Sequence, residues 1–254
     1  MRARTEPNPA PPAIEQAELR AILSHLSHEL GRPLVSLRAG FDLLLGDNKR
    51  PVSGDQRGHL RTMAGLCDEL LDLTRSYLDY AGLMQGTRPL RLGTYGLRAI
   101  LAEIDRQFAP EAAARRVAWS CALEGPDGPV KTDASRCQQL FGNLAANALK
   151  YTPEGGRVAV LARRDGETWS VSIVDDGPGI PAEALDQVFE PFFRLNRDER
   201  SGAEGNGLGL AICRELVEQL GGTVRLGPGD GGGTRALVAL PVEPSLALAA
   251  AASG

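Results

Sequence analysis

His28 has the neighbours that a nucleophilic histidine needs. Leu26 and Leu30 belong to an apolar helical repeat, so His28, two residues from each, is predicted to lie on the opposite, solvent-facing side of the helix. An imidazole with a pKa of about 6.5 is largely neutral at about pH 7, so one ring nitrogen is free to attack an electrophile. Glu29 can orient the ring or accept its proton. Pro33 is expected to bend the helix just beyond the pair.

A lone surface histidine usually belongs to a solvated helix face, and His25 and His59 are interpreted in that way. His28 differs from them in its adjacent acid and in the proline that follows. Its reaction still requires that the chain bind an electrophile, and four separated segments have the composition for that.

The first of these segments carries two amides on one predicted helix. Asn143 and Asn147 lie four residues apart on the same face, with Lys150 and Tyr151 about one turn further on. Amide oxygens can hold a hydrated Mg²⁺, and a lysine supplies a point charge for phosphate. A polar helix face would explain this segment equally well if it stood alone.

The second segment ends an apolar strand with Asp175 and continues through Gly177 and Gly179. A carboxylate at this place can accept a hydrogen bond from the amino group of adenine, and glycines let the backbone approach the base closely. A simple β-turn has the same composition, so this segment is also ambiguous by itself.

The other two segments are an aromatic cluster and a glycine-rich helix start. The aromatic rings of residues 189–193 can anchor a loop or pack in the core. Gly205, Gly207, Leu208 and Gly209 open a predicted helix, where free N–H groups and the helix dipole favour phosphate. A lone glycine motif of this kind is weak evidence.

The elements that position these residues begin with two long helices. Apolar residues recur at steps of three and four in both, at Leu19, Leu23, Leu26, Leu30, Leu34, Leu37, Phe41 and Leu44, and at Leu60, Met63, Cys67, Leu70, Thr74, Tyr77, Ala81 and Met84. Residues 46–54 have the composition of a turn. A two-helix hairpin has too little interior to stand alone, and a four-helix bundle built from two chains solves that problem. We therefore expect a homodimer, with a hairpin packed on the rest of its own chain as the alternative.

The rest of the chain is predicted to form an α/β two-layer sandwich. With the helical hairpin before it, the fold class of the whole chain is α+β. Helices are predicted at 97–115, 135–150 and 207–220. Strands, mostly in antiparallel hairpins, are predicted at 117–123, 157–163, 168–174, 223–226 and 234–242.

Composition excludes several classes of protein. A net charge of -4 and a pI of about 5.5 argue against a sequence-independent nucleic-acid binder. The apolar runs are too short to cross a bilayer, and residues 1–12 lack the apolar core of a secretory signal, so we expect no membrane insertion and a cytoplasmic protein. The four cysteines are widely scattered, so we expect buried free thiols rather than a metal or redox motif.

Taken together, the motifs resemble, in order, those of bacterial sensor histidine kinases. Ser27 to Leu34 looks like the family's H box, and residues 143–151 look like its N box. Asp175, Gly177 and Gly179 resemble the G1 box, residues 189–193 the F box, and 205–210 the G2 box. The resemblance covers roughly residues 15–243, and five motifs in the family's order are hard to explain by chance.

The resemblance implies autophosphorylation of His28 by ATP and Mg²⁺, followed by transfer to an aspartate on a response regulator. It implies a dimerisation and phosphotransfer domain at 14–86, a linker at 87–95 and a catalytic ATP-binding domain of the GHKL (Bergerat) type at 96–243. Tails at 1–13 and 244–254 are expected to be disordered. Residues 194–204 would form a mobile lid, from which Arg197 or Arg200 could reach the phosphates.

Two departures from the family's pattern matter. Arg32 stands where the family usually has Thr or Asn, a position associated with removing phosphate from the regulator, so phosphatase activity is in doubt. Fewer than 30 residues precede His28, so we expect no sensor domain in this chain and either constitutive activity or control by a separate sensory protein. The alternatives are a dimeric docking scaffold that binds nucleotide without turnover and a GHKL-fold ATPase or serine kinase.

Overall fold

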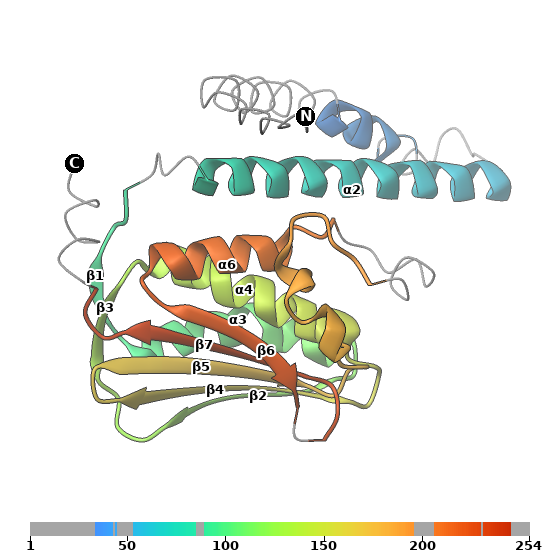
Figure 1. The fold of residues 1–254 in the computed structure, drawn as a ribbon. Helices are drawn as coiled ribbons and strands as arrows, with labels where there is room; N and C mark the ends of the chain where they lie inside the picture. The colour runs from blue at the N-terminus through green and yellow to red at the C-terminus, as the bar shows by residue number, and fades with distance from the viewer. Residues whose placement is uncertain are drawn as a thin grey trace, which may run out of the picture. The chain divides into compact units, whose positions relative to one another are not determined.

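The computed structural model describes residues 34–42, 44, 53–84, 89–195, 206–229 and 231–244. The chain forms two compact units, which divide between Ala81 and Gly82. The first unit is helical and the second contains a sheet covered by helices, so the predicted α+β architecture is confirmed (Figure 1).

The helical unit contains the two predicted helices. Residues 34–42 and 44 are helical, and α2 spans Gly54–Met84. The start of α2 is a capping box, in which Ser53 Oγ accepts from the N–H of Gln56 at 3.3 Å. The side chain of Gln56 accepts in return from the N–H of Ser53 at 3.0 Å. This reciprocal pair explains why the helix begins here.

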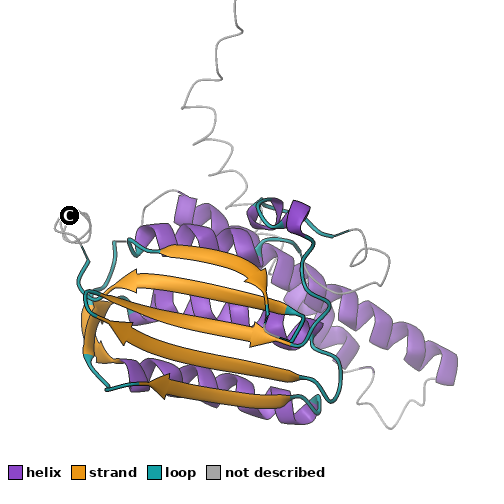
Figure 2. Ribbon diagram, turned by 60° about the horizontal axis from the view of Figure 1, so that its bottom comes forward, coloured by secondary structure: helices purple, strands orange, loops and turns teal. Residues whose placement is uncertain are grey.

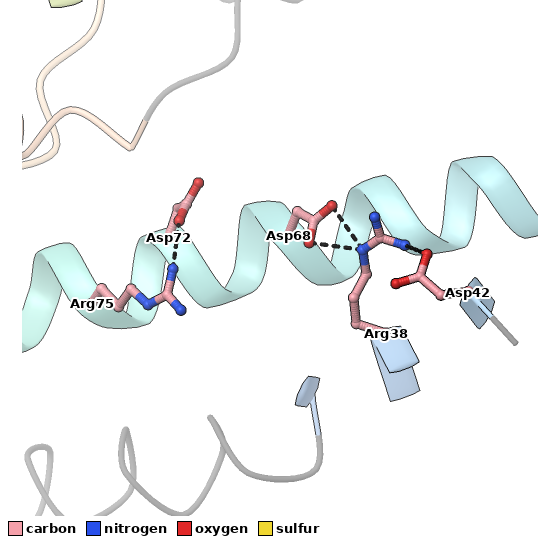
Figure 3. A network of polar contacts seen from close by, with 5 residues as sticks. All are labelled: Arg38, Asp42, Asp68, Asp72 and Arg75. Carbon is pink, nitrogen blue, oxygen red and sulfur yellow. Dashed lines mark hydrogen bonds and ion pairs between the residues drawn. The ribbon is translucent and has the colours of Figure 1, made fainter. Parts of the chain in front are cut away.

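A cluster of charged side chains joins the two helices (Figure 3). Arg38 Nε lies 3.0 Å from both carboxylate oxygens of Asp68 on α2, and its Nη1 lies 2.6 Å from Asp42 one turn along its own helix. Asp72 and Arg75 form a separate pair on α2 at 3.4 Å. The pairs are exposed, so they contribute little to stability, but the contact at Asp68 shows which face of α2 meets the first helix.

The second unit is built on a five-stranded sheet in the order β2-β4-β5-β7-β6. Its strands are β2 (Ala118–Glu124), β4 (Arg157–Asp165), β5 (Thr168–Asp175), β6 (Thr223–Pro228) and β7 (Thr234–Pro241). Helices α3 (Leu97–Ala114), α4 (Ala134–Tyr151) and α6 (Gly209–Gln219) cover one face of this sheet (Figure 2). The two-layer sandwich is as predicted.

Most strand pairs are antiparallel as predicted, but two features of the topology were not predicted from the sequence. Strand β2 pairs with β4 in parallel, because α4 carries the chain across the sheet between them. A separate two-stranded antiparallel sheet joins β1 (Gly93–Gly96) to β3 (Pro129–Thr132). Both strands are only four residues long, too short for a period of two to be visible, and β1 lies mostly in the stretch that the sequence assigned to a linker.

The core lies between the sheet and its helices. Alternate residues of β5 are buried, and Trp169 packs edge-on against Phe141 of α4, with ring centroids 5.9 Å apart. Cys67, Cys137 and Cys213 are buried, Cys121 is partly buried, and all four thiols are free as predicted. Burial raises the pKa of Cys137 to about 12, which keeps it protonated and unreactive.

None of the helices that the structure describes is long and apolar enough to cross a membrane. The cytoplasmic location expected from composition stays a prediction.

Candidate functional site

Helix α4 is the platform of the candidate site. Its N-terminus is capped by Asp133, whose Oδ1 accepts from the N–H groups of Ser135 and Arg136 at 3.0 and 3.2 Å. One face of the helix is fully buried, which fixes its rotation. The predicted polar residues Asn143, Asn147, Lys150 and Tyr151 are partly exposed along one side.

Asp175 lies at the end of β5 and faces the helices. It follows Trp169, Val171 and Ile173 in the alternating buried row, and it is only 7% exposed. Burial raises its pKa, although the N–H groups of Gly177 and Thr234, which donate to Oδ1 at 2.8 and 3.1 Å, favour the charged form. The strand therefore holds a carboxylate in a poorly solvated place, where an uncharged donor such as an amino group is a favourable partner.

The neighbouring Asp176 is held differently. It is exposed, and its Oδ2 accepts from the N–H of Arg157 on β4 at 3.0 Å, while its own N–H donates to the carbonyl of Arg157 at 3.0 Å. This pairing closes the end of the β4–β5 ladder. The two adjacent acids thus differ in their surroundings: Asp175 is buried, whereas Asp176 is exposed at the end of the strand pair.

Glycines surround Asp175 because side chains would not fit there. A Cβ on Gly177 would lie 2.7 Å from Asp175 Oδ1 and 3.0 Å from the carbonyl oxygen of Tyr151 at the end of α4. Gly179 has a φ of +69° and approaches the carbonyl of Gly233. A Cβ on Gly233 would overlap the carbonyl of Asp175. The backbone can therefore lie close to a flat ligand beside the carboxylate.

The aromatic segment divides between core and surface. Phe189, at the end of the short helix η2 (Gln187–Phe189), is 6% exposed and packs in a cluster with Ala184 and Val188. The guanidinium of Arg214 lies 4.5 Å from the centre of its ring. Phe192 is 55% exposed and has a φ of +66°.

Gly207 holds the start of α6 against this segment. It has a φ of +70°, and its carbonyl accepts from the N–H of Phe192 at 3.0 Å. Leu208 is buried and donates its N–H to Asn206 Oδ1 at 3.1 Å. Helix α6 then begins at Gly209, two residues later than the sequence predicted, because the backbone of Gly207 is left-handed. Among the residues that the structure describes, the N-cap residue Leu208 gives this start no side-chain cap, so its first N–H groups suit an anion.

Helices α4 and α6 meet at the predicted residues. Asn143 Nδ2 donates to the carbonyl of Gly209 at 3.4 Å, and a Cβ on Gly209 would lie 3.8 Å from Asn147 Nδ2. Cys213 Sγ also donates to the carbonyl of Leu140 at 3.7 Å. The two amides thus lie beside the N-terminus of α6, and Tyr151 lies beside the loop that follows Asp175.

Several predicted residues lie outside the described part of the chain, namely His28, Glu29, Arg32, Arg197, Arg200 and Gly205. Conversely, sequence reasoning missed Thr234, whose N–H donates to Asp175 and whose side chain also lowers its pKa. It lies 59 residues from Asp175, and only the pairing of β5 with β7 brings it near. Asp133 was missed too, although an acid before a predicted helix is a recognisable cap signal.

Comparisons with known proteins agree with this geometry. Residues 132–244 match the family of histidine kinase-, DNA gyrase B- and HSP90-like ATPases. The chain is 30% identical over 230 residues to the alginate biosynthesis sensor protein KinB of Pseudomonas aeruginosa, covering 91% of this chain and 38% of KinB. The chain spans 24% of the length of the sensor histidine kinase RcsC of Escherichia coli and 55% of that of the sensor protein SphS of Synechococcus elongatus, to which it is 30% and 34% identical.

Two solved structures are similar in both fold and sequence. Full-length ShkA in complex with AMPPNP is 30% identical, with a TM-score of 0.71 over 87% of this chain and 46% of that one. The mycobacterial sensor histidine kinase MprB is 30% identical, with a TM-score of 0.50 over 60% of this chain and 99% of that one. The chain therefore belongs to the sensor histidine kinases.

Proposed function

We propose that the chain is an ATP-dependent protein-histidine kinase that phosphorylates its own His28. The observation that supports this most is the meeting of a buried carboxylate, a helix with two amides and a lysine, and an uncapped helix start within one unit. Each of these features suits a different part of ATP, and the order of the motifs in the sequence includes a histidine able to accept its γ-phosphoryl group.

ATP would bind with its adenine at Asp175. The carboxylate accepts from the exocyclic amino group, and the glycines at 177, 179 and 233 leave room for the ring. The phosphates would extend along α4 toward the free N–H groups at the start of α6, where the helix dipole favours negative charge. Lys150 adds a positive charge on the same helix.

The amide oxygens of Asn143 and Asn147 fit Mg²⁺ as part of an oxygen shell that water and phosphate would complete. The bond from Asn143 Nδ2 to the carbonyl of Gly209 leaves its Oδ1 as the atom for a cation. When bound, Mg²⁺ neutralises charge on the phosphates. The two amides bring no charge of their own, so they would hold the cation through their oxygen dipoles alone.

The transfer step needs little covalent chemistry from the protein. A neutral ring nitrogen of His28 forms a bond to the γ-phosphorus of ATP while the bond to the bridging oxygen breaks, and the bonding electrons leave on ADP. Glu29 stabilises the ring and accepts its proton. The phosphoryl group would then pass to an aspartate of a response regulator, the partner of this family.

A second proposal concerns assembly. Met63, Leu66, Leu70 and Leu73 follow one another at steps of three and four along α2, and each is at least 39% exposed. Asp68, which accepts from Arg38 of the first helix, lies on the opposite side of α2. An apolar stripe of this kind needs a partner helix, and we propose a second copy of this chain.

The dimer can be tested by measuring mass in solution. Light scattering of the purified chain should give the mass of two copies, and Leu66→Glu with Leu70→Glu should shift it to one copy. Leu161→Glu, which changes an exposed leucine of the sheet, is the matched control and should leave the dimer intact. A monomeric parent at micromolar concentration would contradict the proposal.

The kinase reaction is tested by incubating the pure chain with ATP labelled at its γ-phosphate. The expected result is a protein-bound label that is lost in acid and kept in base, as a phosphoramidate bond requires. An acid-stable label would indicate a serine kinase instead. Release of labelled phosphate without labelled protein would indicate an ATPase, and binding of ATP without either product would indicate a scaffold.

Arg32 leads to a third expected result. It lies four residues after His28 on the predicted helix, one turn away, where its guanidinium can pair with a phosphoryl group. It cannot position a water as Thr or Asn can, so we expect no phosphatase activity, and Arg32→Thr should create or raise it. Decay of a phosphorylated regulator is measured with and without the chain, in the presence of nucleotide. Rapid decay with the parent chain would show that this interpretation of Arg32 is wrong.

A further inference from the structure

Asp133 makes contacts that exceed those of a helix cap. It is only 3% exposed, and its two oxygens have separate partners. Oδ1 accepts from the N–H and hydroxyl groups of Ser135 at 3.0 and 2.6 Å and from the N–H of Arg136. Oδ2 accepts from the N–H of Arg91 at 2.7 Å, 42 residues earlier in the chain. One carboxylate therefore joins two segments of backbone.

Arg91 lies near the start of the second unit, between the end of α2 and β1. Helix α2 ends at Met84, and β1 begins at Gly93. Pairing of Gly93 with Thr132 places the chain before β1 next to the residue that follows β3, which is Asp133. The bond from Arg91 to the side chain of Asp133 thus continues the backbone hydrogen bonds between β1 and β3 beyond the ends of both strands.

The pKa of Asp133 indicates that these hydrogen bonds are strong. Burial alone would raise the pKa of Asp133, but the hydrogen bonds from Ser135, Arg91 and Arg136 outweigh it and hold the pKa below its usual value. Asp133 is therefore ionised at neutral pH, and its bonds are charge-assisted. Nothing about capping α4 requires the bond to Arg91, because Oδ1 alone does that work.

We infer that Asp133 is a positioning residue for phosphoryl transfer, which fixes the peptide entering from α2 to the helix that carries Asn147 and Lys150. The inference rests on the proposed kinase function. His28 precedes this peptide in the sequence, and the candidate ATP site follows it. Fixing residues 89–92 removes conformations in which the two reacting groups are far apart, which raises their effective concentration.

A substitution at position 133 can remove the bond to Arg91 while keeping the cap of α4. Asn at position 133 keeps one oxygen for the cap, since Asn and Asp cap helices about equally well. Its amide nitrogen would then face the N–H of Arg91, and two donors cannot bond to each other. Asp133→Ser gives the same separation with no second polar atom, since serine also caps well.

For both variants, we expect the rate of autophosphorylation at saturating ATP to fall about 5-fold or more, with ATP affinity within about 2-fold of the parent. Hydrogen exchange of the peptide 89–92 should become faster, while that of 134–151 stays unchanged. Asp127→Asn is the matched control: it removes one negative charge from the loop just before β3, where Asp127 Oδ1 accepts from the N–H of Arg98 at 3.3 Å. Its rate should equal that of the parent.

Other outcomes are equally clear. A rate at or above that of the parent, or a loss of ATP affinity and thermal stability without slower transfer, would reduce Asp133 to a structural cap and overturn the inference. If the parent itself transfers no phosphoryl group, the kinase proposal fails. Comparing hydrogen exchange of residues 89–92 in the parent and the variants then still shows whether Asp133 fixes this peptide.

Discussion

Replacing His28 by glutamine should abolish phosphorylation of the chain while leaving ATP binding unchanged. Glutamine is similar in size and polarity, but its amide nitrogen is not nucleophilic, so no bond to phosphorus can form. Residual transfer is expected to be below detection, because no other side chain is predicted to lie in the same place. The measurement is incorporation of label from γ-labelled ATP, with nucleotide affinity and mass in solution measured on the same sample.

His59 provides the matched control for this experiment. It is exposed on α2, in the same helical unit, and has no adjacent acid and no following proline. His59→Gln should be labelled as fully as the parent, and so should His25→Gln. Full labelling of the His28 variant, or loss of label in the His59 variant, would mean that the nucleophile has been assigned to the wrong residue.

The second large effect is expected at Asp175. In Asp175→Asn, the amide oxygen can keep the bonds from the N–H groups of Gly177 and Thr234, while the second oxygen becomes an amino group. That group would face the amino group of adenine, donor to donor. The mispaired contact should cost about 1–3 kcal/mol of binding free energy, so ATP affinity should fall roughly 10-fold or more.

The fold should tolerate this change. Because burial raises the pKa of Asp175 on folding, the ionised side chain makes folding less favourable at every pH above the pKa of its unfolded form. A neutral amide removes that cost. The melting temperature of the variant without nucleotide should therefore be at least that of the parent at neutral pH. The difference should shrink as the pH falls through the raised pKa of Asp175 toward the pKa of its unfolded form.

Asp176→Asn is the control, since it removes the same charge one residue away. Asp176 accepts from the backbone of Arg157 and is exposed, so its replacement should leave ATP affinity within about 2-fold of the parent. Calorimetric titration with ATP measures both variants. If Asp176→Asn weakened binding and Asp175→Asn did not, the assignment of the adenine contact would have to be reversed.

Those parts of the site that consist of neighbouring residues could be predicted from the sequence. Asn143 and Asn147 share a helix face by spacing alone, and Asp175 follows an apolar strand that ends in glycines. The sequence could not show that Asn143 donates to Gly209 or that Thr234 reaches Asp175, because those contacts depend on how helices and strands pack. The motif selected Asp175 rather than Asp176, and the phase of β5 gives the two acids different exposures, since Asp175 is buried and Asp176 is exposed.

The same limit applies to the fold. Long periodic segments such as α2 and α4 were predicted within a few residues, since many residues repeat one pattern. Strands β1 and β3 are too short to show a pattern, and β1 starts and ends in glycine. The parallel pairing of β2 with β4 depends on which edge of the sheet α4 returns to, and no local signal encodes that.

The alternation of buried and exposed residues along β5 also limits where residues can be inserted or deleted in this protein. The strand is paired on both sides, with Val158 opposite Asp175 on β4 and Arg235 opposite Val174 on β7. Inserting or deleting one residue between Trp169 and Asp175 would place these two side chains on opposite faces of the sheet, so one of them would leave the buried row. Insertions can be absorbed at the turn of Gly166 and Glu167, upstream of the strand. In homologues of this chain, the number of residues between the positions of Trp169 and Asp175 should therefore stay the same even where the residues themselves are substituted.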